Sequence, residues 1–574
     1  MSHILSHIKI VEKTGFLAAE KILFLKVGNA GIQVMKKVVV IYFVSYCRLY
    51  RLAFRILCRV TIWEKQERRL RKVKGKTQKS VFLILMALQL ILAAALLIRV
   101  CRMNMLPGGY IAAYVLLVAI VNIAMPAAVM ISKKRSAVFL ADAVCILLSL
   151  AMLCGSLALY RLDHTLQKIS DSMPTEITRM AVIVLEEDPA KAVTDISGYA
   201  VGYAEKDAAA KEMTEKLHEM LSPDADYSGY ADVISLCNAL LEKKEDAVIL
   251  DEAYVDIISG LDGYEDFADK VRVLDTVEVE TQVEEPVADY EETAKPEEAQ
   301  DTGEDIAPTK DPRRLSSDEE SFIVYISGID TFGSVNVRSR SDVNILAAVN
   351  TRTGHIQLIN TPRDYYVTLP VSGSVRDKLT HAGLYGVDNS EGALEQLYGI
   401  EIDYYVRMNF SGFEDIIDTL GGIDVYSAYE FTVEPVRHYT VGYNHLSGRE
   451  ALAFARERHA FASGDVQRGI NQMEVVKAMI SKLATVEFLY HYDEILEGLT
   501  DCFQTDIPSG LIYSMVKNQL SAQTSWQVDT YSVTGRGSHE TTYSMPGVTA
   551  YVMIPDEEKV AEAKKLIEET LDGE

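Results

Sequence analysis

The sequence predicts three membrane-spanning helices followed by two α/β units, of which the second is an α/β sandwich around a mixed sheet. Three observations indicate this class. Three long apolar runs follow one another in the N-terminal third of the chain. Beyond them, short apolar runs typical of buried strands alternate with segments of helical spacing. The 574 residues also leave room for several units, at roughly 100–200 residues per domain.

The charge and the cysteines exclude several classes of protein. A net charge of −25 argues against a general nucleic-acid binder, because phosphate backbones select basic surfaces. The seven cysteines show no C-x-x-C spacing, which argues against a zinc site or a disulfide framework. A single bridge between Cys237 and Cys502, the two cysteines beyond the N-terminal part, stays open.

The three apolar runs are Val81–Ile98, Tyr110–Ile131 and Ala137–Tyr160. Each has about the ~20 residues that a helix needs to cross a ~30 Å hydrocarbon core. A buried helical bundle is the alternative, but three such runs in close succession disfavour it. A cleaved signal peptide would have a shorter and single apolar region. We therefore expect three membrane helices within residues 80–160.

The basic residues beside these runs predict the orientation in the membrane. Arg68–Lys76 precedes the first run and Lys133–Arg135 separates the second from the third, whereas the first loop holds only Arg99 and Arg102. Short loops rich in Lys and Arg stay in the cytoplasm. The N-terminus and the second loop should therefore be cytoplasmic, and the chain after about Arg161 should be extracellular.

Residues 1–79 form a basic cytoplasmic segment. Four of its arginines recur every three or four residues and would share one helical face: Arg48, Arg51, Arg55 and Arg59. Such a face is typical of a basic amphipathic helix on an anionic inner leaflet. An upstream extension without a role explains the pattern equally well.

Residues 161–280 predict a small extracellular α/β accessory domain. Its expected strands and helices are, in order, Ala181–Leu185, Ala200–Tyr203, the helix Ala208–Leu221, the helix Tyr230–Leu241, and Ala247–Leu250. It shows no catalytic constellation, so a binding or spacer module is expected. Residues 281–316 follow as an acidic linker rich in Glu, Asp and Pro.

Residues 317–574 predict the second α/β unit, the α/β sandwich. Strands are expected at Phe322–Ile326, Asp342–Val349 and His355–Asn360, with a polar loop ending in Gly354 that makes the last two a hairpin. Helical spacing from Phe410 to Leu420 ends at Gly421-Gly422, and Ile423–Tyr426 begins a new strand.

Two further helices carry charged residues. Ser447-Gly448-Arg449-Glu450 is a capping box that opens a helix expected to carry Arg456 and Arg458. Asp465, Arg468 and Gln472 stand at i, i+3 and i+7 and therefore share one face of the next helix.

Arginines and aspartates recur at the ends of these elements, in an otherwise acidic protein. The residues concerned are Asp330, Arg340, Asp342, Arg363, Arg456, Arg458, Asp465 and Arg468. Arginine fits phosphate bidentately, and aspartate offers hard oxygen ligands to a magnesium-type ion. Taken singly, each residue is explained by a surface charge or an ordinary ion pair. Together they predict a site for a metal-bound phosphate or pyrophosphate.

Motifs for other hydrolytic and nucleotide-binding enzymes are missing from the sequence. It contains no G-x-S-x-G, no H-E-x-x-H and no phosphate-loop lysine motif. A serine hydrolase, a zincin and a P-loop enzyme are therefore disfavoured.

The region from about Ser321 to Leu483 resembles the LytR–CpsA–Psr family. The motifs that carry the resemblance are S-R-S-D at Ser339–Asp342, T-P-R-D at Thr361–Asp364, D-K-L-T-H-A-G at Asp377–Gly383, D-Y-Y-V-R-M-N-F at Asp403–Phe410, L-G-G-I-D-V at Leu420–Val425, A-F-A-R-E-R at Ala453–Arg458 and G-D-V-Q-R-G-I-N-Q at Gly464–Gln472. Three membrane spans, an accessory domain and then this domain resemble the capsule-type branch of the family. Ile470 departs from the pattern, because many members carry a basic residue there.

The resemblance implies a membrane-anchored phosphotransferase. Such an enzyme moves a glycopolymer, which can be capsular polysaccharide, teichoic acid or a related polymer, from a polyprenyl-pyrophosphate carrier to peptidoglycan through a phosphodiester. It also implies that Asp330 and Asp342 hold Mg²⁺ (or Mn²⁺) at the pyrophosphate. Phosphate contacts are implied for Arg340, Arg363, Arg456, Arg458 and Arg468, with Gln472 as a polar neighbour. Arg363 and Arg458 are the arginines expected to act in catalysis, by stabilising charge as the bond to the leaving phosphate breaks. The general base stays open between Asp342 and Asp465, on chemical grounds.

Two further questions stay open at this stage. The stripe formed by Phe410, Phe413, Ile416 and Leu420 can line an apolar groove for a polyprenyl tail or can be ordinary core, and core is the preferred interpretation. Three functions stay open for the charged site: transfer, hydrolysis as in a polyprenyl-pyrophosphate pyrophosphatase, and sensing as in a non-catalytic regulator of envelope assembly. The intact set of arginines and aspartates favours catalysis over sensing.

Overall fold

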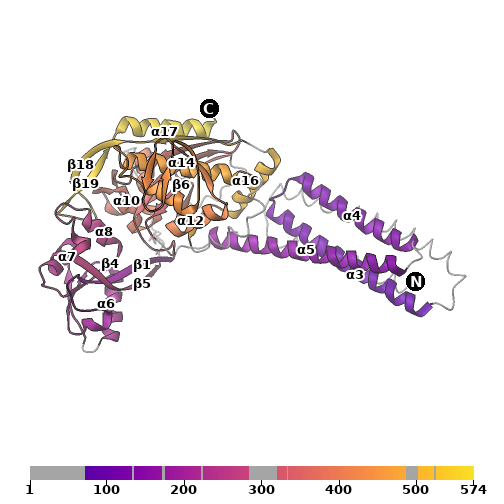
Figure 1. Cartoon of the computed structure of the whole chain (residues 1–574), viewed down its shortest axis with the longest axis horizontal. Coiled ribbons are helices and arrows are strands. Elements are labelled where there is room, and N and C mark those ends of the chain that lie inside the picture. Colours follow the sequence, from indigo (N-terminus) through magenta and orange to yellow (C-terminus); the bar gives the residue numbers. More distant parts are fainter. Residues whose placement is uncertain are drawn as a thin grey trace, which may run out of the picture. The chain divides into compact units, whose positions relative to one another are not determined.

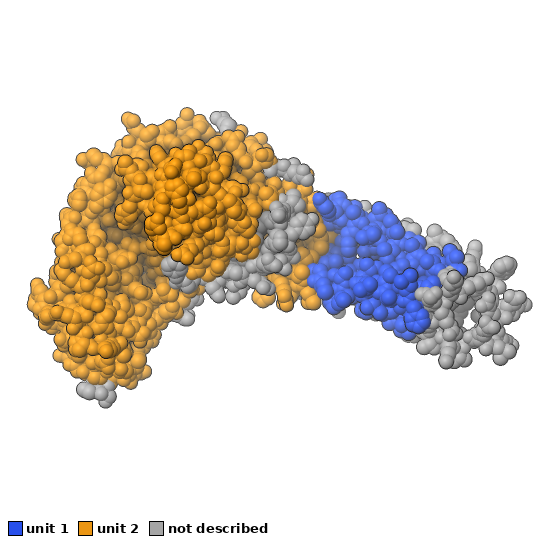
Figure 2. Space-filling view, in the orientation of Figure 1, with its two compact units in different colours: residues 1–97, 108–155 blue, residues 98–107, 156–574 orange. Residues whose placement is uncertain are grey.

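The computed structural model describes residues 72–131, 135–170, 175–221, 224–282, 320–331, 334–485, 502–522 and 525–573 (Figure 1). The basic face at Arg48–Arg59 and most of the acidic linker lie outside these residues. The chain forms two compact units, residues 1–97 with 108–155 and residues 98–107 with 156–574 (Figure 2).

Three long helices account for the apolar runs. They are α3 (Lys72–Met103), α4 (Gly108–Ile131) and α5 (Arg135–Ser170). Their apolar stretches, Ser80–Met103, Gly108–Ile131 and Ala137–Gln167, are long enough to cross a membrane, and at most 22% of any of them is buried within the protein. Apolar side chains that face outward in this way suit a lipid environment. The three expected helices are confirmed, and each is long and apolar enough to span a membrane.

The accessory domain is a five-stranded sheet with helices against it. The strand order is β3-β2-β4-β1-β5, with β1 at Thr175–Leu185, β2 at Ala200–Ala204, β3 at Asp226–Tyr230, β4 at Ala247–Asp251 and β5 at Val271–Gln282. The helices are η2 (Val193–Ile196), α6 (Ala208–Met220), α7 (Val233–Leu241), α8 (Ala253–Ser259) and α9 (Phe267–Lys270). Cys237 is buried in this domain, and the Cys237–Cys502 bridge that the sequence left open does not form among the described residues.

One predicted boundary in this domain is wrong. The helix expected from Tyr230 begins at Val233, because Tyr230 is the last residue of β3. Asp232 is the N-cap, and its carboxylate accepts a hydrogen bond from the Ser235 backbone N–H at 2.8 Å. This side-chain bond satisfies a donor of the first helical turn and fixes the start of the helix.

The C-terminal domain, residues 317–574, which the family resemblance implies to be catalytic and which is called the catalytic domain below, is built on a mixed six-stranded sheet, as predicted. The strand order is β16-β11-β6-β7-β8-β17, with β6 at Ser321–Ile329, β7 at Ser341–Asn350, β8 at His355–Asn360, β11 at Tyr404–Met408, β16 at Phe503–Thr505 and β17 at Gln527–Ser532. The β6–β7 and β7–β8 pairs are antiparallel, whereas β11 and β17 join the sheet in parallel to β6 and β8.

Helices cover both faces of this sheet and make it an α/β sandwich. On one face, Tyr325 and Leu346 pack into a core with α10 (Leu379–Ala382), α11 (Val387–Tyr398) and α17 (Glu557–Asp572). On the other face, Val324 and Ile345 pack with α14 (Asp465–Leu483) and α16 (Ser509–Ala522). Successive residues of each strand thus alternate between two cores, which explains why the strands read as continuous apolar runs.

A third core holds the helices that flank the candidate site. It joins α12 (Phe410–Thr419), α13 (Gly448–Arg456) and α14 through Ile417, Phe454 and Val475. Short strand pairs complete it: β12 (Ile423–Ser427) with β15 (Gly442–Leu446), and β13 (Phe431–Val433) with β14 (Arg437–Tyr439). A Cβ at Gly448 would come within 2.2 Å of the Glu414 carbonyl oxygen, so glycine permits the close approach of α12 and α13.

Two more strand pairs and two short helices complete the domain. The pairs are β9 (Tyr366–Thr368) with β10 (Arg376–Lys378), and β18 (Gly535–Thr541) with β19 (Thr549–Pro555); the helices are η3 (Pro370–Ser372) and η4 (Gly383–Tyr385).

Candidate active site

The residues singled out in the sequence gather around one cavity of about 900 Å³. Eight of the nine line it: Asp330, Arg340, Asp342, Arg363, Arg456, Arg458, Arg468 and Gln472. Three of these residues stand at strand ends: Asp330 follows β6, Asp342 lies at the start of β7 and Arg363 follows β8. Helix α13 carries Arg456, and helix α14 carries Arg468 and Gln472. Asp465 is not a lining residue, but it pairs with Arg468, Oδ1 to Nη2, at 2.6 Å.

Asp342 and Arg363 form the centre of the charged part. Arg363 Nη1 donates to Asp342 Oδ2 at 2.8 Å, and the Thr380 hydroxyl donates to Asp342 Oδ1 at 3.0 Å. Burial opposes ionisation of Asp342, but the charges of Arg363, Arg340 and Arg468 outweigh it and lower the pKa of Asp342 to about 2. Asp342 is therefore an anion at neutral pH.

Arg363 and Arg468 each hold a donor that no acceptor among the described residues satisfies. Their side chains are only 17% and 9% exposed, and both Nε atoms are buried without a hydrogen-bond partner in that part of the chain. The nearest acid to Arg363 Nε, Asp364, is 3.8 Å away. Burial and the neighbouring charge of Arg363 lower the pKa of Arg468. Buried, unpaired guanidinium donors are costly, and an anion with several oxygens would satisfy them.

Asp330 lies between two other arginines. Arg340 Nη2 donates to Asp330 Oδ2 at 2.8 Å, and Arg456 Nη2 is 3.8 Å from Asp330 Oδ1. The Arg456 guanidinium also lies over the Phe410 ring, 4.3 Å from its centroid. Stacking on an aromatic face orients Arg456 while half of its side chain stays exposed to solvent and to a ligand.

Arg458 is placed differently from the prediction. Helix α13 ends at Arg456, and Glu457 has an extended backbone. The Glu457 carboxylate accepts a hydrogen bond from the Ala460 backbone N–H at 2.8 Å, which stabilises a turn in place of another helical turn. Arg458 therefore lies in the loop, exposed, and its Nε is 3.4 Å from His459 Nε2. It still lines the cavity.

Gln472 is buried on α14, one turn beyond Arg468. Its Nε2 donates to the Ala455 carbonyl oxygen at 3.3 Å. This bond ties α14 to α13, so Gln472 positions the two helices that carry Arg456 and Arg468.

Five of the other charged or polar residues of the cavity, none of them assigned a role from the sequence, are Asp256, Asp364, Lys378, Thr380 and His381. All but Asp256 lie in the T-P-R-D and D-K-L-T-H-A-G motifs, so the motifs themselves were the available signal. Lys378 Nζ is 3.2 Å from Asp364 Oδ1 and keeps that carboxylate paired.

Gly383, at the end of the second of these motifs, supports the loop of Arg340. A Cβ there would stand 2.5 Å from the Ser339 carbonyl oxygen and 2.8 Å from the Ser341 backbone nitrogen. Only glycine allows α10 to approach this loop so closely. The position of Arg340 thus depends on a backbone contact as well as on its ion pairs.

The cavity also has an apolar part. It is lined by Ile326, Val343, Met408, Phe410, Phe413, Val475, Val476 and Met479 among others. Along α14, the lining changes from Arg468 to Met479, a distance of roughly 16 Å at 1.5 Å per residue. The predicted stripe on α12 divides: Phe410 and Phe413 line the cavity, whereas Ile416 and Leu420 belong to the core. A charged end and a long apolar end suit an amphiphilic ligand.

The carboxylates fit a magnesium ion that a substrate helps to hold. Asp330 and Asp342 both line the cavity, and Asp342 is ionised at neutral pH. Magnesium is commonly bound through one or two carboxylates, with substrate phosphates and water as its remaining ligands. The described residues hold no group of three or more His, Cys, Asp or Glu side chains suited to a metal. The donor set thus fits an ion that arrives with phosphates.

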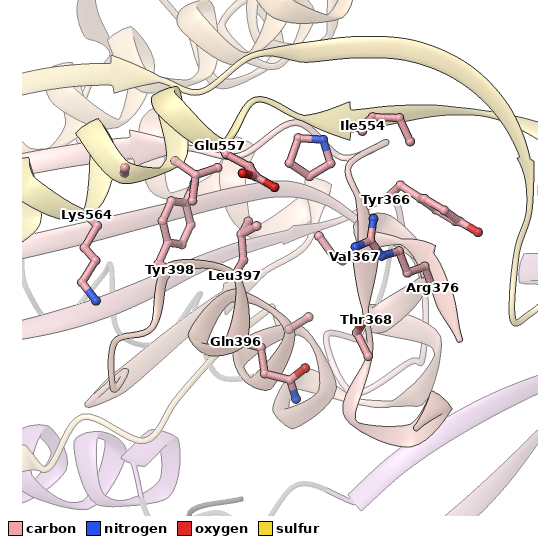
Figure 3. Close-up of a pocket in the computed structure, with 14 residues that line it drawn as sticks. Tyr366, Val367, Thr368, Arg376, Gln396, Leu397, Tyr398, Ile554, Glu557 and Lys564 are labelled. Carbon is pink, nitrogen blue, oxygen red and sulfur yellow. The ribbon is translucent and has the colours of Figure 1, made fainter. Parts of the chain in front are cut away.

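A second, smaller cavity of about 550 Å³ lies between β9, β10, α11, β19 and α17 (Figure 3). Arg376, Gln396, Glu557 and Lys564 are its polar lining, and Arg376 lies beside Tyr366. It shares no lining residue with the larger cavity and contains none of the residues singled out in the sequence. The residues that the sequence predicts for the site therefore gather at the larger cavity and not at this one.

Known proteins are similar to parts of this chain. A teichoic acid transferase of Bacillus cereus, TagU, is 34% identical over 203 residues, 35% of this chain and 66% of its own length. TagU of Enterococcus faecalis is 31% identical over 208 residues, 36% of this chain and 68% of its own. The first match thus spans just under two thirds of the relative's length. Among solved structures, B. subtilis TagV is 27% identical with a TM-score of 0.38, covering 44% of this chain and 98% of that one.

The family model that matches this chain is that of the LytR_cpsA_psr family, over residues 281–567. This stretch is half of the chain. It contains every residue that lines the larger cavity except those of the accessory domain. The chain belongs to the LytR–CpsA–Psr family, as the motifs predicted.

Proposed function

We propose that this protein is a membrane-anchored phosphotransferase that joins a glycopolymer, carried on polyprenyl pyrophosphate, to peptidoglycan through a phosphodiester. The observation that carries the proposal is the combination, in one cavity, of buried guanidinium donors that no described residue accepts and a long apolar wall. A pyrophosphate with a polyprenyl tail has the two matching parts. The relatives are named as polyisoprenyl-teichoic acid–peptidoglycan teichoic acid transferases, which supports this substrate class.

In the proposed reaction, a peptidoglycan hydroxyl attacks the phosphorus next to the sugar. The bond from that phosphorus to the bridging oxygen breaks, and polyprenyl phosphate leaves with the electron pair. Arg363 and Arg468 carry the buried Nε donors that find no acceptor in the described part of the chain, and they would hold the phosphate oxygens as negative charge moves to the leaving group. Phosphoryl transfer depends mainly on such positioning and charge neutralisation.

The base that accepts the hydroxyl proton stays open between Asp342, which lines the cavity, and Asp465, which pairs with Arg468 and is not a lining residue. Burial, with Asp364 and Asp342 nearby, raises the pKa of Asp465, although Arg468 and Arg363 oppose the shift. A carboxylate with a raised pKa is a stronger base. Asp342, with its pKa of about 2, is a weak base and is better suited to a metal.

Asp330 and Asp342 would hold the magnesium ion, and a bound ion would neutralise charge on the two phosphates. Transfer should therefore stop when divalent cations are chelated and return with Mg²⁺ or Mn²⁺. The Asp330→Asn and Asp342→Asn variants should each bind Mn²⁺ more weakly in the presence of polyprenyl pyrophosphate, as measured by electron paramagnetic resonance. Unchanged turnover after exhaustive chelation would contradict the metal assignment.

The reaction products decide between transfer and its alternatives. The full-length protein in detergent would be incubated with labelled lipid-linked glycopolymer and peptidoglycan. Label joined to peptidoglycan supports the proposal. Released phosphorylated polymer without joined product would indicate a pyrophosphatase, and binding without turnover would indicate a sensor.

We also propose that the accessory and catalytic domains lie outside the cell, with the N-terminus in the cytoplasm. The basis is the excess of Lys and Arg at Arg68–Lys76 and Lys133–Arg135 over the first loop. Protease added to intact, wall-stripped cells should cut the acidic segment 281–312. Protection of that segment together with cutting near Arg68–Lys79 in the same cells would reverse the topology.

A further inference from the structure

The accessory domain supplies part of the wall of the larger cavity. Four lining residues come from α8 and the residue after it: Asp256, Ile257, Ser259 and Gly260. The sequence of this domain shows no catalytic constellation, so its contribution becomes visible only in the folded chain. An accessory domain that merely spaced the catalytic domain from the membrane would not need to reach the cavity.

Asp256 makes direct contact with the charged site. Arg340 Nη2 donates to Asp256 Oδ2 at 3.0 Å and to Asp330 Oδ2 at 2.8 Å. The Arg340 side chain is 15% exposed, whereas that of Asp256 is 66% exposed. The guanidinium is thus held between two carboxylates, and the accessory carboxylate is the one that remains open to solvent in the cavity.

Two further sets of contacts fix this arrangement. Strand β1 of the accessory domain holds the loop that leads to Arg340: Ile177 N donates to Asn336 O at 2.9 Å, and Arg338 N donates to Ile177 O at 2.8 Å. Helix α8 is anchored by a core in which Ile258 and Leu261 of the accessory domain pack with Met545, Ala550 and Leu384 of the catalytic domain. The Asp256 carboxylate is therefore held in place by the fold.

We propose that α8 forms the glycan side of the cavity and that Asp256 determines specificity for the sugar attached to the pyrophosphate. This inference rests on the proposed function. The donor runs in the order polyprenyl chain, pyrophosphate, sugar. An exposed carboxylate is unfavourable beside an apolar chain and repels phosphate, but it accepts hydrogen bonds from sugar hydroxyl and amide groups.

The composition of the cavity agrees with this order. The aliphatic wall between Arg468 and Met479 belongs to the catalytic domain, whereas Asp256 contacts the guanidinium of Arg340. Of the three parts of the donor, only the sugar suits the space beside Asp256. The accessory domain would then bind the first sugar and select among sugars, while the catalytic domain holds the phosphates.

The test compares donors with and without a sugar on the full-length protein in detergent. The probes are polyprenyl pyrophosphate and the same lipid carrying N-acetylglucosamine, N-acetylgalactosamine or glucose, with dissociation constants measured by calorimetry. The wild type should bind one of the sugar-bearing lipids more tightly than the others. Asp256→Ala should weaken binding of that lipid roughly tenfold, the loss expected for a hydrogen bond to a charged group. Sugar-free lipid should bind within about twofold of wild type.

Two variants sharpen the result. Asp256→Asn keeps one acceptor oxygen and should fall between the wild type and Asp256→Ala. Asp266→Ala removes an accessory carboxylate of similar exposure, 59%, which pairs with Lys270 and does not line the cavity, and it should change neither affinity.

Equal weakening of sugar-bearing and sugar-free lipid by Asp256→Ala would overturn the inference, because Asp256 would then act only by positioning Arg340. An unchanged preference among the sugars would overturn it as well. If the wild type binds none of the polyprenyl pyrophosphates, the proposed function itself fails.

Discussion

Replacing Arg363 by alanine should slow transfer of the glycopolymer by roughly 10²–10³-fold, which is the usual effect of losing one donor to a developing negative charge. Arg468→Ala should have an effect of similar size, because both guanidinium groups carry a buried Nε that no acceptor among the described residues satisfies. Arg363→Lys should restore only part of the rate, since lysine keeps the charge but loses the planar fork. The measurement is the initial rate of transfer at saturating donor.

The matched control is Arg352→Ala. Arg352 also forms an ion pair, with Glu320 at 3.3 Å, but its side chain is 55% exposed and does not line the cavity. Its loss should leave the transfer rate and the melting temperature close to wild type. The Arg363→Ala and Arg468→Ala variants should remain folded at the assay temperature, although loss of the Arg363–Asp342 pair lowers the melting temperature. An Arg363→Ala variant that transfers at a near-normal rate would show that Arg363 is not in the site, and one that unfolds would show that its role is structural.

The second large effect concerns stability. Asp377→Ala should destabilise the catalytic domain by about 3–5 kcal/mol, the range for removing one partner of a buried pair. The Asp377 carboxylate is 0% exposed and accepts hydrogen bonds from His381 Nδ1 at 2.7 Å, Ser544 N at 2.8 Å and Lys378 N at 2.7 Å. Its loss removes the buried acceptor shared by His381, Ser544 and Lys378, and leaves the Ser544 hydroxyl, 2.8 Å from His381 Nδ1, as the remaining contact between them.

Thermal or urea unfolding of the full-length protein measures this loss. The control is Asp529→Ala, which removes the carboxylate of another His–Asp pair, His355–Asp529 at 3.0 Å, in which the Asp529 side chain is half-exposed. An exposed pair contributes less than about 1 kcal/mol, so this variant should unfold nearly as the wild type does. Equal losses in the two variants would show that the burial of Asp377 does not set its contribution.

The pH dependence of this contribution has a definite sign. Burial alone would raise the pKa of Asp377, but the charge and hydrogen bond of His381 and the bonds from Ser544 lower it below its usual value. When folding lowers the pKa of a carboxyl group, its ionised form stabilises the folded state. This stabilisation is complete above the pKa of the group in the unfolded chain, about 3.9 for Asp, and is lost as the pH falls through its pKa in the folded protein. The stability difference between the wild type and Asp377→Asn should be constant from neutral pH to about pH 5 and shrink below about pH 4.

Much of the site could be predicted because its residues follow elements that have clear sequence patterns. Asp330, Asp342 and Arg363 stand at the ends of apolar strands, and the structure brings them to one cavity. The position of Arg458 could not be predicted, because α13 ends before it. The Glu457 side chain accepts a hydrogen bond from Ala460 N, and helical spacing alone does not show when a side chain forms such a turn in place of the next helical turn.

The apolar stripe on α12 shows a second limit. Helical spacing identifies Phe410, Phe413, Ile416 and Leu420 as one apolar face, but it does not show that the first half of this face meets a cavity and the second half a core. The roles of Asp256 and Gly383 depend on contacts between residues far apart in the chain, Asp256 with Arg340 and Gly383 with Ser339. Neither residue stands in a local pattern that points to its partner.

The most direct test of the account is a structure of the full-length protein with a polyprenyl pyrophosphate and Mg²⁺ bound. We expect phosphate oxygens within hydrogen-bond distance of Nε of Arg363 and of Arg468, and the polyprenyl chain along the wall formed by Phe413, Val475 and Met479. A pyrophosphate bound elsewhere, with both Nε atoms still without an acceptor, would contradict the account.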